Sequence, residues 1–480
     1  MLARDPQSVP LGAAEQFGLE LLLDLSRVLP CDGSFDTVRL RIADGEAGSV
    51  RTCISSSWMI QRSDGVVTLP RGVLRVIAAI AGAEEEQRCA LRDRFGRVPP
   101  ECNALVIERL ERAPVVSQAA VQLRRAAADV AARRPFRALT PWPEGKRWAA
   151  AFTHDLDVVA KWPVFTALRV AELARKGEVG RVLSVLGAAL RSSAGNPVWN
   201  GVEGLLRAER TSGVRSSWFV LCGTPTMSTM KAGDLTYSIE SRGARRILDA
   251  VSAGGHEIGL HGSFETYSDA EVMRAQRIRL TRAAGEPHGI RQHYLRMVPG
   301  DTQRAMASAG FRYDSTFGFA DRNGFRVGVA DVLPAWHAGT QTPAGIDELP
   351  FIWMDRALSK YRGVESPRAW IEDALELADL CRSVEGLFSA VWHPNLTPAL
   401  GFPGAPAAYE SLMRDVVDRS PWIATMGEIH TWRRARRSAR ATQLLPDGRV
   451  VVDAPERTPW PVTLEDASGA ATRDHMRASS

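Results

Sequence analysis

Strand-like and helix-like segments alternate along the chain from about residue 147 to about residue 432. The strand candidates, which are short apolar runs, cover residues 148–153, 217–222, 257–260, 291–295, 346–350, 387–392 and 422–425. Longer amphipathic stretches separate them, and this alternation requires parallel strands joined by helical crossovers. The sequence therefore predicts an α/β fold, either a barrel or an open sheet. In both architectures the working residues gather at the carboxyl ends of the strands.

The segments on either side of this region have a different pattern. Residues 1–143 mix short strand-like runs with helices and end in a proline-containing linker at 141–143, which predicts a domain boundary. Beyond residue 436, an Asp-Gly pair between apolar runs at 444–452 predicts a hairpin. We therefore expect three parts: an α+β N-terminal accessory domain at 1–143, the α/β domain at 144–436, and a short β-rich tail at 437–480.

Length, charge and hydrophobicity limit the class of protein. A chain of 480 residues is long enough for an enzyme, and its net charge of +5, with a pI near 9.0, does not require a nucleic-acid partner. Part of this excess lies in the arginine-rich run at 433–440, which we expect to be a solvated helix face or a linker. No apolar run reaches the ~20 residues that a membrane span needs. The sequence does not indicate an oligomeric state.

The six cysteines are scattered and include no C-x-x-C pair. This distribution is typical of buried free thiols in a reducing compartment. The N-terminus shows no charged segment leading into an apolar core, so a signal peptide is not expected. We therefore predict a cytoplasmic protein.

The most informative stretch is Thr153-His154-Asp155-Leu156-Asp157, which follows an apolar run. If it ends a strand, the period of two places Thr153, Asp155 and Asp157 on one face. Two carboxylates on one face repel each other unless a cation lies between them or one is protonated, which favours a metal site or an acid/base pair. The alternative is a helix N-cap, because a helical pattern follows directly.

Histidines mark three further strand ends. None of the nine precedes His154, and only His475 lies beyond His430, so the chemistry is expected in the middle of the chain. In Gly255-His256-Glu257-Ile258-Gly259-Leu260-His261, alternation puts the two histidines on opposite faces, and His261, at the end of the strand, is the better candidate ligand. Arg291 and His293 share a face if their segment is a strand, and His393 ends an apolar run. Each histidine alone could instead be an ordinary core residue.

These motifs, in this order, resemble those of the NodB-like polysaccharide deacetylases, carbohydrate esterase family 4. The resemblance covers about residues 147–430 and matches a subgroup whose first motif is Thr-His-Asp-x-Asp. It implies a distorted (β/α) barrel that removes N- or O-acetyl groups from glycans with a divalent metal, often zinc. By position it implies that Asp155 is the general base and His393 the general acid, and that Arg291 orients the base. It further implies that Asp157 and His261 bind the metal.

One position departs from the family pattern. The family's second metal-binding histidine usually lies four residues after the first, and here that position is Glu265. We expect His293 to be the third ligand instead, because imidazole is a common zinc ligand and the strand period would place it beside Arg291. Glu265 is the alternative ligand. A third possibility is an incomplete metal site in a domain that only binds glycan.

The sequence therefore predicts a metal-dependent hydrolase acting on an acetylated glycan or sugar conjugate. Hydrolysis of an unactivated amide needs an activated water, a base beside it and an acid for the leaving amine. The predicted residues supply each of these. The alternatives are hydrolysis of another non-peptide C-N bond, such as a cyclic amide, and non-catalytic glycan binding.

Overall fold

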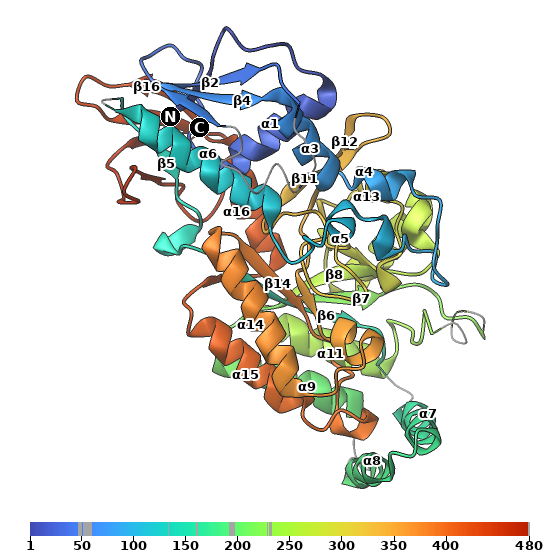
Figure 1. The fold of residues 1–480 in the computed structure, drawn as a ribbon. Helices are drawn as coiled ribbons and strands as arrows, with labels where there is room; N and C mark the ends of the chain where they lie inside the picture. The colour runs from blue at the N-terminus through green and yellow to red at the C-terminus, as the bar shows by residue number, and fades with distance from the viewer. Residues whose placement is uncertain are drawn as a thin grey trace.

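The computed structural model describes residues 1–46, 50, 60–132, 134–159, 162–191, 197–227, 229 and 233–478. Its centre is a curled sheet in the order β11-β12-β10-β9-β8-β7-β6-β14-β13, with β15 also paired to β6 (Figure 1). The β11/β12 pair is antiparallel and the other described pairs of this sheet are parallel. No pairing joins β11 to β13 among the described residues, so the sheet is an open half-barrel. The α/β class is confirmed, and the curled sheet fits the distorted barrel that the sequence predicts.

The strands of this sheet are short and largely buried. They are β6 (Ala149–Leu156), β7 (Ser217–Leu221), β8 (Glu257–Gly262), β9 (Gly289–Gln292), β10 (Tyr313–Asp314), β11 (Leu333–His337), β12 (Thr342–Glu348), β13 (Trp353–Met354), β14 (Leu387–Val391) and β15 (Trp422–Ile423). Every residue of β6 is buried, as expected for a central strand covered on both faces. Because β7, β8 and β9 follow β6 side by side, their carboxyl ends meet at one edge of the sheet.

Helices connect most of these strands. They are α7 (Trp162–Arg175), α8 (Val179–Arg191), α9 (Pro197–Thr211), α11 (Arg242–Ala253), α12 (Ala270–Ala284), α13 (Asp301–Ser308), α14 (Pro367–Ser383), α15 (Ala405–Val417) and α16 (Met426–Ser438). Short turns of 3-10 helix lie at Thr266–Ser268, His293–Leu295 and Pro398–Leu400, and a π turn lies at Ala357–Tyr361. α7 and α8 project from the body of the molecule (Figure 1).

The N-terminal residues form a second sheet in the order β1-β2-β4-β3. Its strands are β1 (Leu2–Arg4), β2 (Val38–Ala43), β3 (Gln61–Ser63) and β4 (Val66–Pro70), and β5 (Ala138–Leu139) follows later in the chain. The helices of this part are α1 (Ala13–Ser26), α3 (Arg71–Ala81), α4 (Glu84–Arg88), α5 (Ala104–Ile107) and α6 (Val115–Ala131), with 3-10 turns at Pro100–Cys102 and Pro143–Gly145.

The tail contains β16 (Arg440–Leu444), β17 (Val450–Ala454), β18 (Leu464–Glu465) and β19 (His475–Ala478). β16 and β17 form the antiparallel pair expected from the Asp-Gly turn, and β18 pairs with β5. The N-terminal core also includes barrel residues, for example through a stacked contact of Phe17 with Trp336, whose ring centroids are 4.5 Å apart. The three-part division at 143 and 436 remains a prediction.

The arginine-rich run does not form the solvated face that the sequence suggested. Arg433 and Arg436, on α16, are buried and pair with Asp331, and Arg433 also pairs with Asp24 on α1. Arg434, between them, is half exposed. The prediction was wrong for the buried side of the helix because the carboxylates that compensate it lie about 100 and 400 residues away in sequence.

The cysteine prediction is also corrected in part. Cys222 and Cys381 are buried free thiols, as expected, and Cys31 is a half-buried free thiol. Cys89 and Cys102, however, are joined in a disulfide that closes a surface loop. Cys53 lies outside the described residues. Within the described residues, no helix is both long enough and apolar enough to cross a membrane.

Candidate active site

The carboxyl ends of β6, β8, β9 and β14 bring the predicted site residues together. These residues are Asp155, Asp157, His261, Arg291, His293 and His393. All except Arg291 line a cavity of about 270 Å³, and Arg291 lies beneath it, fully buried. α7 begins at Trp162, so Asp157 is not the N-cap that formed the alternative interpretation.

Asp155 is held in place by Arg291. Nη1 of Arg291 donates to Oδ1 of Asp155 at 2.7 Å and to Oγ1 of Thr153 at 3.0 Å, which confirms that Thr153 and Asp155 share a face. Nε and Nη2 of the same guanidinium donate to the carbonyl and hydroxyl oxygens of Ser315, both at 2.9 Å. Burial alone would raise the pKa of Asp155, but Arg291 and the nearby imidazoles outweigh it and lower that pKa. The carboxylate is therefore ionised and fixed.

The guanidinium of Arg291 rests on an aromatic ring. Its Cζ lies 4.2 Å from the ring centroid of Phe219, on β7. A Cβ added to Gly259, on the neighbouring strand β8, would come within 2.8 Å of that ring. The glycine of the Gly-Leu-His motif thus leaves space for the ring that supports Arg291.

Asp157, His261 and His293 form a group that could hold a metal ion. One potential ligand atom from each residue lies within 4.8 Å of the others. Nε2 of His261 is 3.4 Å from Oδ1 of Asp157, and Nε2 of His293 is 3.7 Å from the same oxygen. One carboxylate and two imidazoles are a donor set that suits zinc and leaves room for further ligands.

Hydrogen bonds on the far side of each ring leave both Nε2 atoms free to bind. Nδ1 of His261 donates to the carbonyl oxygen of Arg291 at 2.8 Å, and Nδ1 of His293 donates to Oδ1 of Asp234 at 2.7 Å. Because a carbonyl oxygen and a carboxylate are acceptors, the proton of each neutral ring lies on Nδ1. Nε2 then presents a lone pair to Asp157, as in histidines that bind metals.

Asp157 provides the sharpest indication that a cation fits here. Its Oδ1 is buried and has no hydrogen-bond partner among the described residues. Burial alone would raise the pKa of Asp157, but the nearby Nε2 of His261 and the positive charge that His261, His293 and His393 carry when protonated outweigh it and lower that pKa. This buried carboxylate needs positive charge beside it, and where the rings are neutral a divalent cation held by Asp157 and the two Nε2 atoms supplies that charge.

His393 faces the same cavity from the segment directly after β14. Its Nε2 lies 3.7 Å from Oδ2 of Asp157, and its Nδ1 donates to Oδ1 of the fully buried Asp355 at 2.7 Å. Asp355 also accepts the backbone N–H of His393 at 2.6 Å. Burial alone would lower the pKa of His393, but Asp355 and the two site aspartates outweigh it and raise that pKa. The ring is therefore oriented with Nε2 toward the cavity.

The position of His293 agrees with the sequence prediction, but the reasoning behind it was wrong. β9 ends at Gln292, and His293 lies in a 3-10 turn whose next residue, Tyr294, has a φ of 60°. The turn, and not the strand period, brings the ring to Asp157. Glu265, the alternative ligand, has a side chain that is 77% exposed and lies 3.8 Å from Arg296. It does not belong to the group of potential metal ligands.

Sequence reasoning missed three residues of the site. Asp234 and Asp355 hold His293 and His393, and Arg97, from the N-terminal part, lines the cavity and donates to the carbonyl oxygen of Tyr294 at 3.3 Å. Asp355 carried a usable signal, because it directly follows an apolar run, as His393 does. Asp234 and Arg97 lie in loops and carried none.

The other two histidines of the motifs lie away from the cavity. Nε2 of His154 is 2.7 Å from Oε1 of Glu209, and Nδ1 of His154 is 2.7 Å from the carbonyl oxygen of Trp392. Nδ1 of His256 accepts the backbone N–H of Ser216 at 3.0 Å. Both positions agree with the predicted strand alternation, which placed His154 on the face opposite to Asp155 and His256 on the face opposite to His261.

Comparisons with known proteins concern the fold. No family model and no curated protein matches the chain. A Mycobacterium smegmatis protein described as a polysaccharide deacetylase is 23% identical, with 64% of this chain and 96% of that chain covered and a TM-score of 0.41. Puue allantoinase is 17% identical, with 61% of this chain and 92% of that chain covered and a TM-score of 0.41. A Pseudomonas aeruginosa PAO1 protein described as a polysaccharide deacetylase is 18% identical, with 61% of this chain and 92% of that chain covered and a TM-score of 0.39. The function is therefore argued from the site itself.

Proposed function

We propose that this protein is a metal-dependent hydrolase that removes acetyl groups from an N- or O-acetylated sugar or polysaccharide. The observation that carries the proposal is the group of Asp157, His261 and His293, in which a buried carboxylate oxygen with no hydrogen-bond partner among the described residues faces two Nε2 atoms. Zinc is the ion that this donor set favours. A cation held there acts as a Lewis acid and lowers the pKa of a water molecule beside it.

Asp155 is suited to the role of general base. Its Oδ2 lies 3.9 Å from Nε2 of His261, and its Oδ1 is bound by Arg291, so one oxygen faces the metal group while the other is fixed. In this role the carboxylate takes a proton from the attacking water as the oxygen adds to the acetyl carbonyl carbon. Arg291 keeps the carboxylate ionised and oriented.

His393 is suited to the role of general acid. Its Nδ1 is bound by Asp355, and its Nε2 lies 3.7 Å from Oδ2 of Asp157, whereas His261 and His293 approach Oδ1. A proton delivered from Nε2 to the leaving nitrogen or oxygen allows the bond to the acetyl carbon to break, which releases acetate and the free amine or alcohol. Asp155 and His393 both line the cavity that contains the predicted metal ligands.

Acetate release from N-acetylated oligosaccharides, measured with the zinc-loaded protein, tests the proposal. We expect Asp155→Asn to keep its metal but to lose at least ~100-fold in kcat, because it removes the base. The matched control is Glu265→Gln, an exposed carboxylate near the site, which should retain activity. Zinc binding without acetate release would point to another C-N bond as substrate, and glycan binding without zinc would leave a binding domain.

A further inference from the structure

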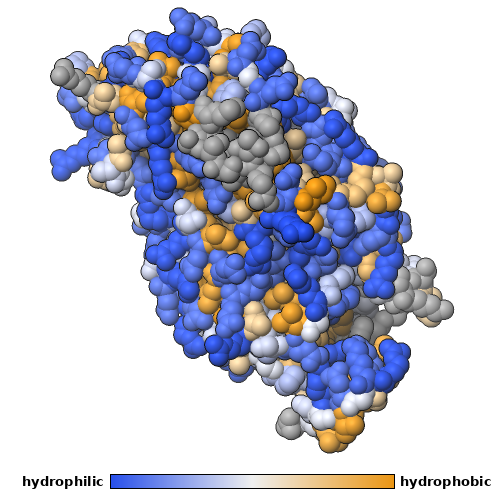
Figure 2. Space-filling model, viewed as in Figure 1, coloured by the Kyte–Doolittle hydropathy of each residue, from blue (hydrophilic) through white to orange (hydrophobic). Residues whose placement is uncertain are grey.

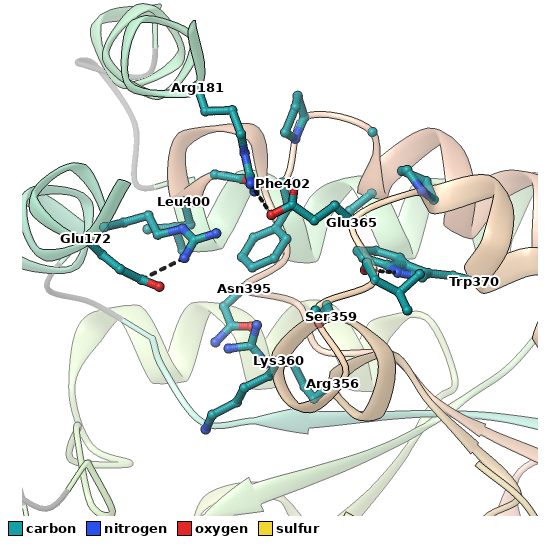
Figure 3. A pocket seen from close by; sticks show the side chains of 18 of the residues that line it. Glu172, Arg181, Arg356, Ser359, Lys360, Glu365, Trp370, Asn395, Leu400 and Phe402 are labelled. Carbon is teal, nitrogen blue, oxygen red and sulfur yellow. Dashed lines mark hydrogen bonds and ion pairs between the residues drawn. The ribbon is translucent and has the colours of Figure 1, made fainter. Parts of the chain in front are cut away.

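A second and larger cavity, of about 650 Å³, adjoins the catalytic one (Figure 3). Arg356, Lys360 and Asn395 line both cavities, so they form the boundary between them. The remaining walls come from α7, α8, residues 363–365, the first turn of α14 and the segment around Phe402. In Figure 3, Arg356, Lys360 and Asn395 lie beside one another on one side of the Phe402 ring.

The lining of this cavity is basic. Its five basic residues are Arg169, Lys176, Arg181, Arg356 and Lys360, and its two acidic residues are Glu172 and Glu365. Arg169 and Lys176 pair with Glu172, and Arg181 pairs with Glu178 and Glu365.

Arg356 and Lys360 differ from these paired residues. Neither has a carboxylate partner among the residues that the structure describes, and Arg356 instead lies over the ring of Phe402, with its Cζ 5.5 Å from the centroid. Two uncompensated cations at the boundary of a cavity create a local positive potential. An anion is the ligand that this potential attracts.

We propose that this cavity binds an anionic group of the phosphate class that is attached to the sugar substrate. A guanidinium and an ammonium together match a phosphate or a pyrophosphate, with several N–H donors for its oxygens. The volume lies in the range of small-molecule sites and exceeds that of a phosphate alone, so it also admits part of the group that the phosphate carries. This inference rests on the proposed function, because it places the acetylated sugar in the neighbouring cavity.

Isothermal titration of the zinc-loaded protein with inorganic pyrophosphate tests the anion site without any turnover. We expect the Arg356→Gln/Lys360→Gln variant to bind at least ~10-fold more weakly, since hydrogen bonds to charged groups contribute about 1.5–3 kcal/mol each. The matched control, Arg368→Gln, removes a cation that is 87% exposed on α14 and should change nothing. Lys360→Gln alone, at an exposed position, serves if the double variant does not fold, and it should also weaken binding. Unchanged binding in these variants overturns the proposal and would place pyrophosphate on the metal.

A kinetic comparison then separates this proposal from the proposed function. We expect kcat/KM for N-acetylglucosamine 1-phosphate to exceed that for N-acetylglucosamine in the wild-type protein, and the ratio to fall at least ~10-fold in the double variant. Equal ratios in both proteins overturn the anion site but leave the deacetylase activity in place. Pyrophosphate binding that depends on Arg356 and Lys360, without any acetate release, would support the anion site and overturn the proposed deacetylase activity.

A separate observation concerns the outer face of α8. Val179, Leu183, Leu186 and Leu190 are 65%, 64%, 43% and 74% exposed, and their spacing of four, three and four residues places them on one side of the helix. Figure 2 shows orange side chains at the tip of the projection that α7 and α8 form. An apolar stripe on a projecting helix is unusual for a surface that faces only water.

We infer that this stripe lies on an anionic lipid surface. The stripe contains four aliphatic side chains, whereas a stable protein interface uses about 20–30 residues on each side. It is therefore too small to form a dimer interface with a second copy of the chain. Residues 162–191 contain five basic and two acidic residues, which gives the segment a net positive charge. An apolar face together with positive charge is typical of helices that lie at lipid surfaces. A phosphate carried by a lipid would then reach the second cavity from beside this helix.

Co-sedimentation with vesicles of phosphatidylcholine and phosphatidylglycerol tests the lipid site. We expect Leu183→Ser/Leu186→Ser/Leu190→Ser to bind at least ~10-fold more weakly, whereas the control Leu91→Ser/Ile107→Ser, at other exposed apolar positions, binds as the wild type does. Equal binding of the triple variant overturns the inference. A dimer that forms in solution and dissociates in the triple variant would also overturn it, in favour of a second copy.

Discussion

Replacing Arg433 by methionine is expected to destabilise the protein by about 3 kcal/mol, the lower end of the ~3–5 kcal/mol range for breaking a buried ion pair. Arg433 is fully buried, and its removal takes a cation from both Asp24 and Asp331. The value lies at the lower end because each carboxylate keeps one arginine: Arg437 is 2.9 Å from Asp24, and Arg436 is 3.2 Å from Asp331. With an unfolding entropy of ~2.1 cal/mol/K per residue, this loss lowers Tm by about 3 °C.

The same substitution should change how stability depends on pH. Burial alone would raise the pKa of Asp24, but Arg433, Arg437 and Arg436 outweigh it and lower that pKa. A lowered pKa in the folded state gives stability that is present above the unfolded pKa of ~3.9 and is lost as the pH falls below it. Arg433→Met should therefore show a shallower acid loss than the wild type.

Chemical denaturation at several pH values measures both effects. The matched control is Arg434→Met on the same helix, whose side chain is 48% exposed and pairs with the exposed Glu456. It should change stability by less than about 1 kcal/mol. Equal stability losses in the two variants, or an unaltered acid limb in Arg433→Met, would refute the assignment of a buried ion-pair network.

Two further predictions concern groups that the sequence did not reveal. Asp234→Asn should weaken zinc binding ~10–100-fold in a competition titration, because His293 loses the carboxylate that orients it, and an unchanged affinity would contradict that role. Burial and the facing carboxyl of Asp314 raise the pKa of Glu348 well above its usual value, so this group adds stability at low pH that is lost as the pH rises. Glu348→Gln should flatten the loss of stability that sets in as the pH rises above ~4.3, the unfolded pKa of a glutamate, in urea denaturation, and an equally steep loss would contradict the assignment.

The position of the site could be predicted because its main residues carry a local signal. Asp155, His261 and His393 each lie at the end of an apolar strand. Parallel pairing alone places the carboxyl ends of such strands at one edge of the sheet. The central strands and most helices of the α/β region were predictable for the same reason. Their periodicity depends on neighbours in sequence.

The residues that could not be predicted depend on contacts between distant segments. The buried charge of Arg433 is compensated by Asp24, on a helix about 400 residues earlier, and nothing near Arg433 in sequence indicates it. Asp234 and Arg97 reach the site from loops. His293 lies beside Asp157, as expected, but its strand ends one residue before it, and a turn with a positive φ cannot be derived from the strand period.

The metal content of the purified protein tests the central claim most directly. Incubation with zinc, removal of free ion and elemental analysis should give one zinc per chain for the wild type and for Asp155→Asn. Asp157→Ala, His261→Ala and His293→Ala should each lose the bound ion, because each removes one of the three ligands. Glu265→Ala should keep it. Loss of zinc from the Glu265 variant alone, or equal retention in all the variants, would contradict the account.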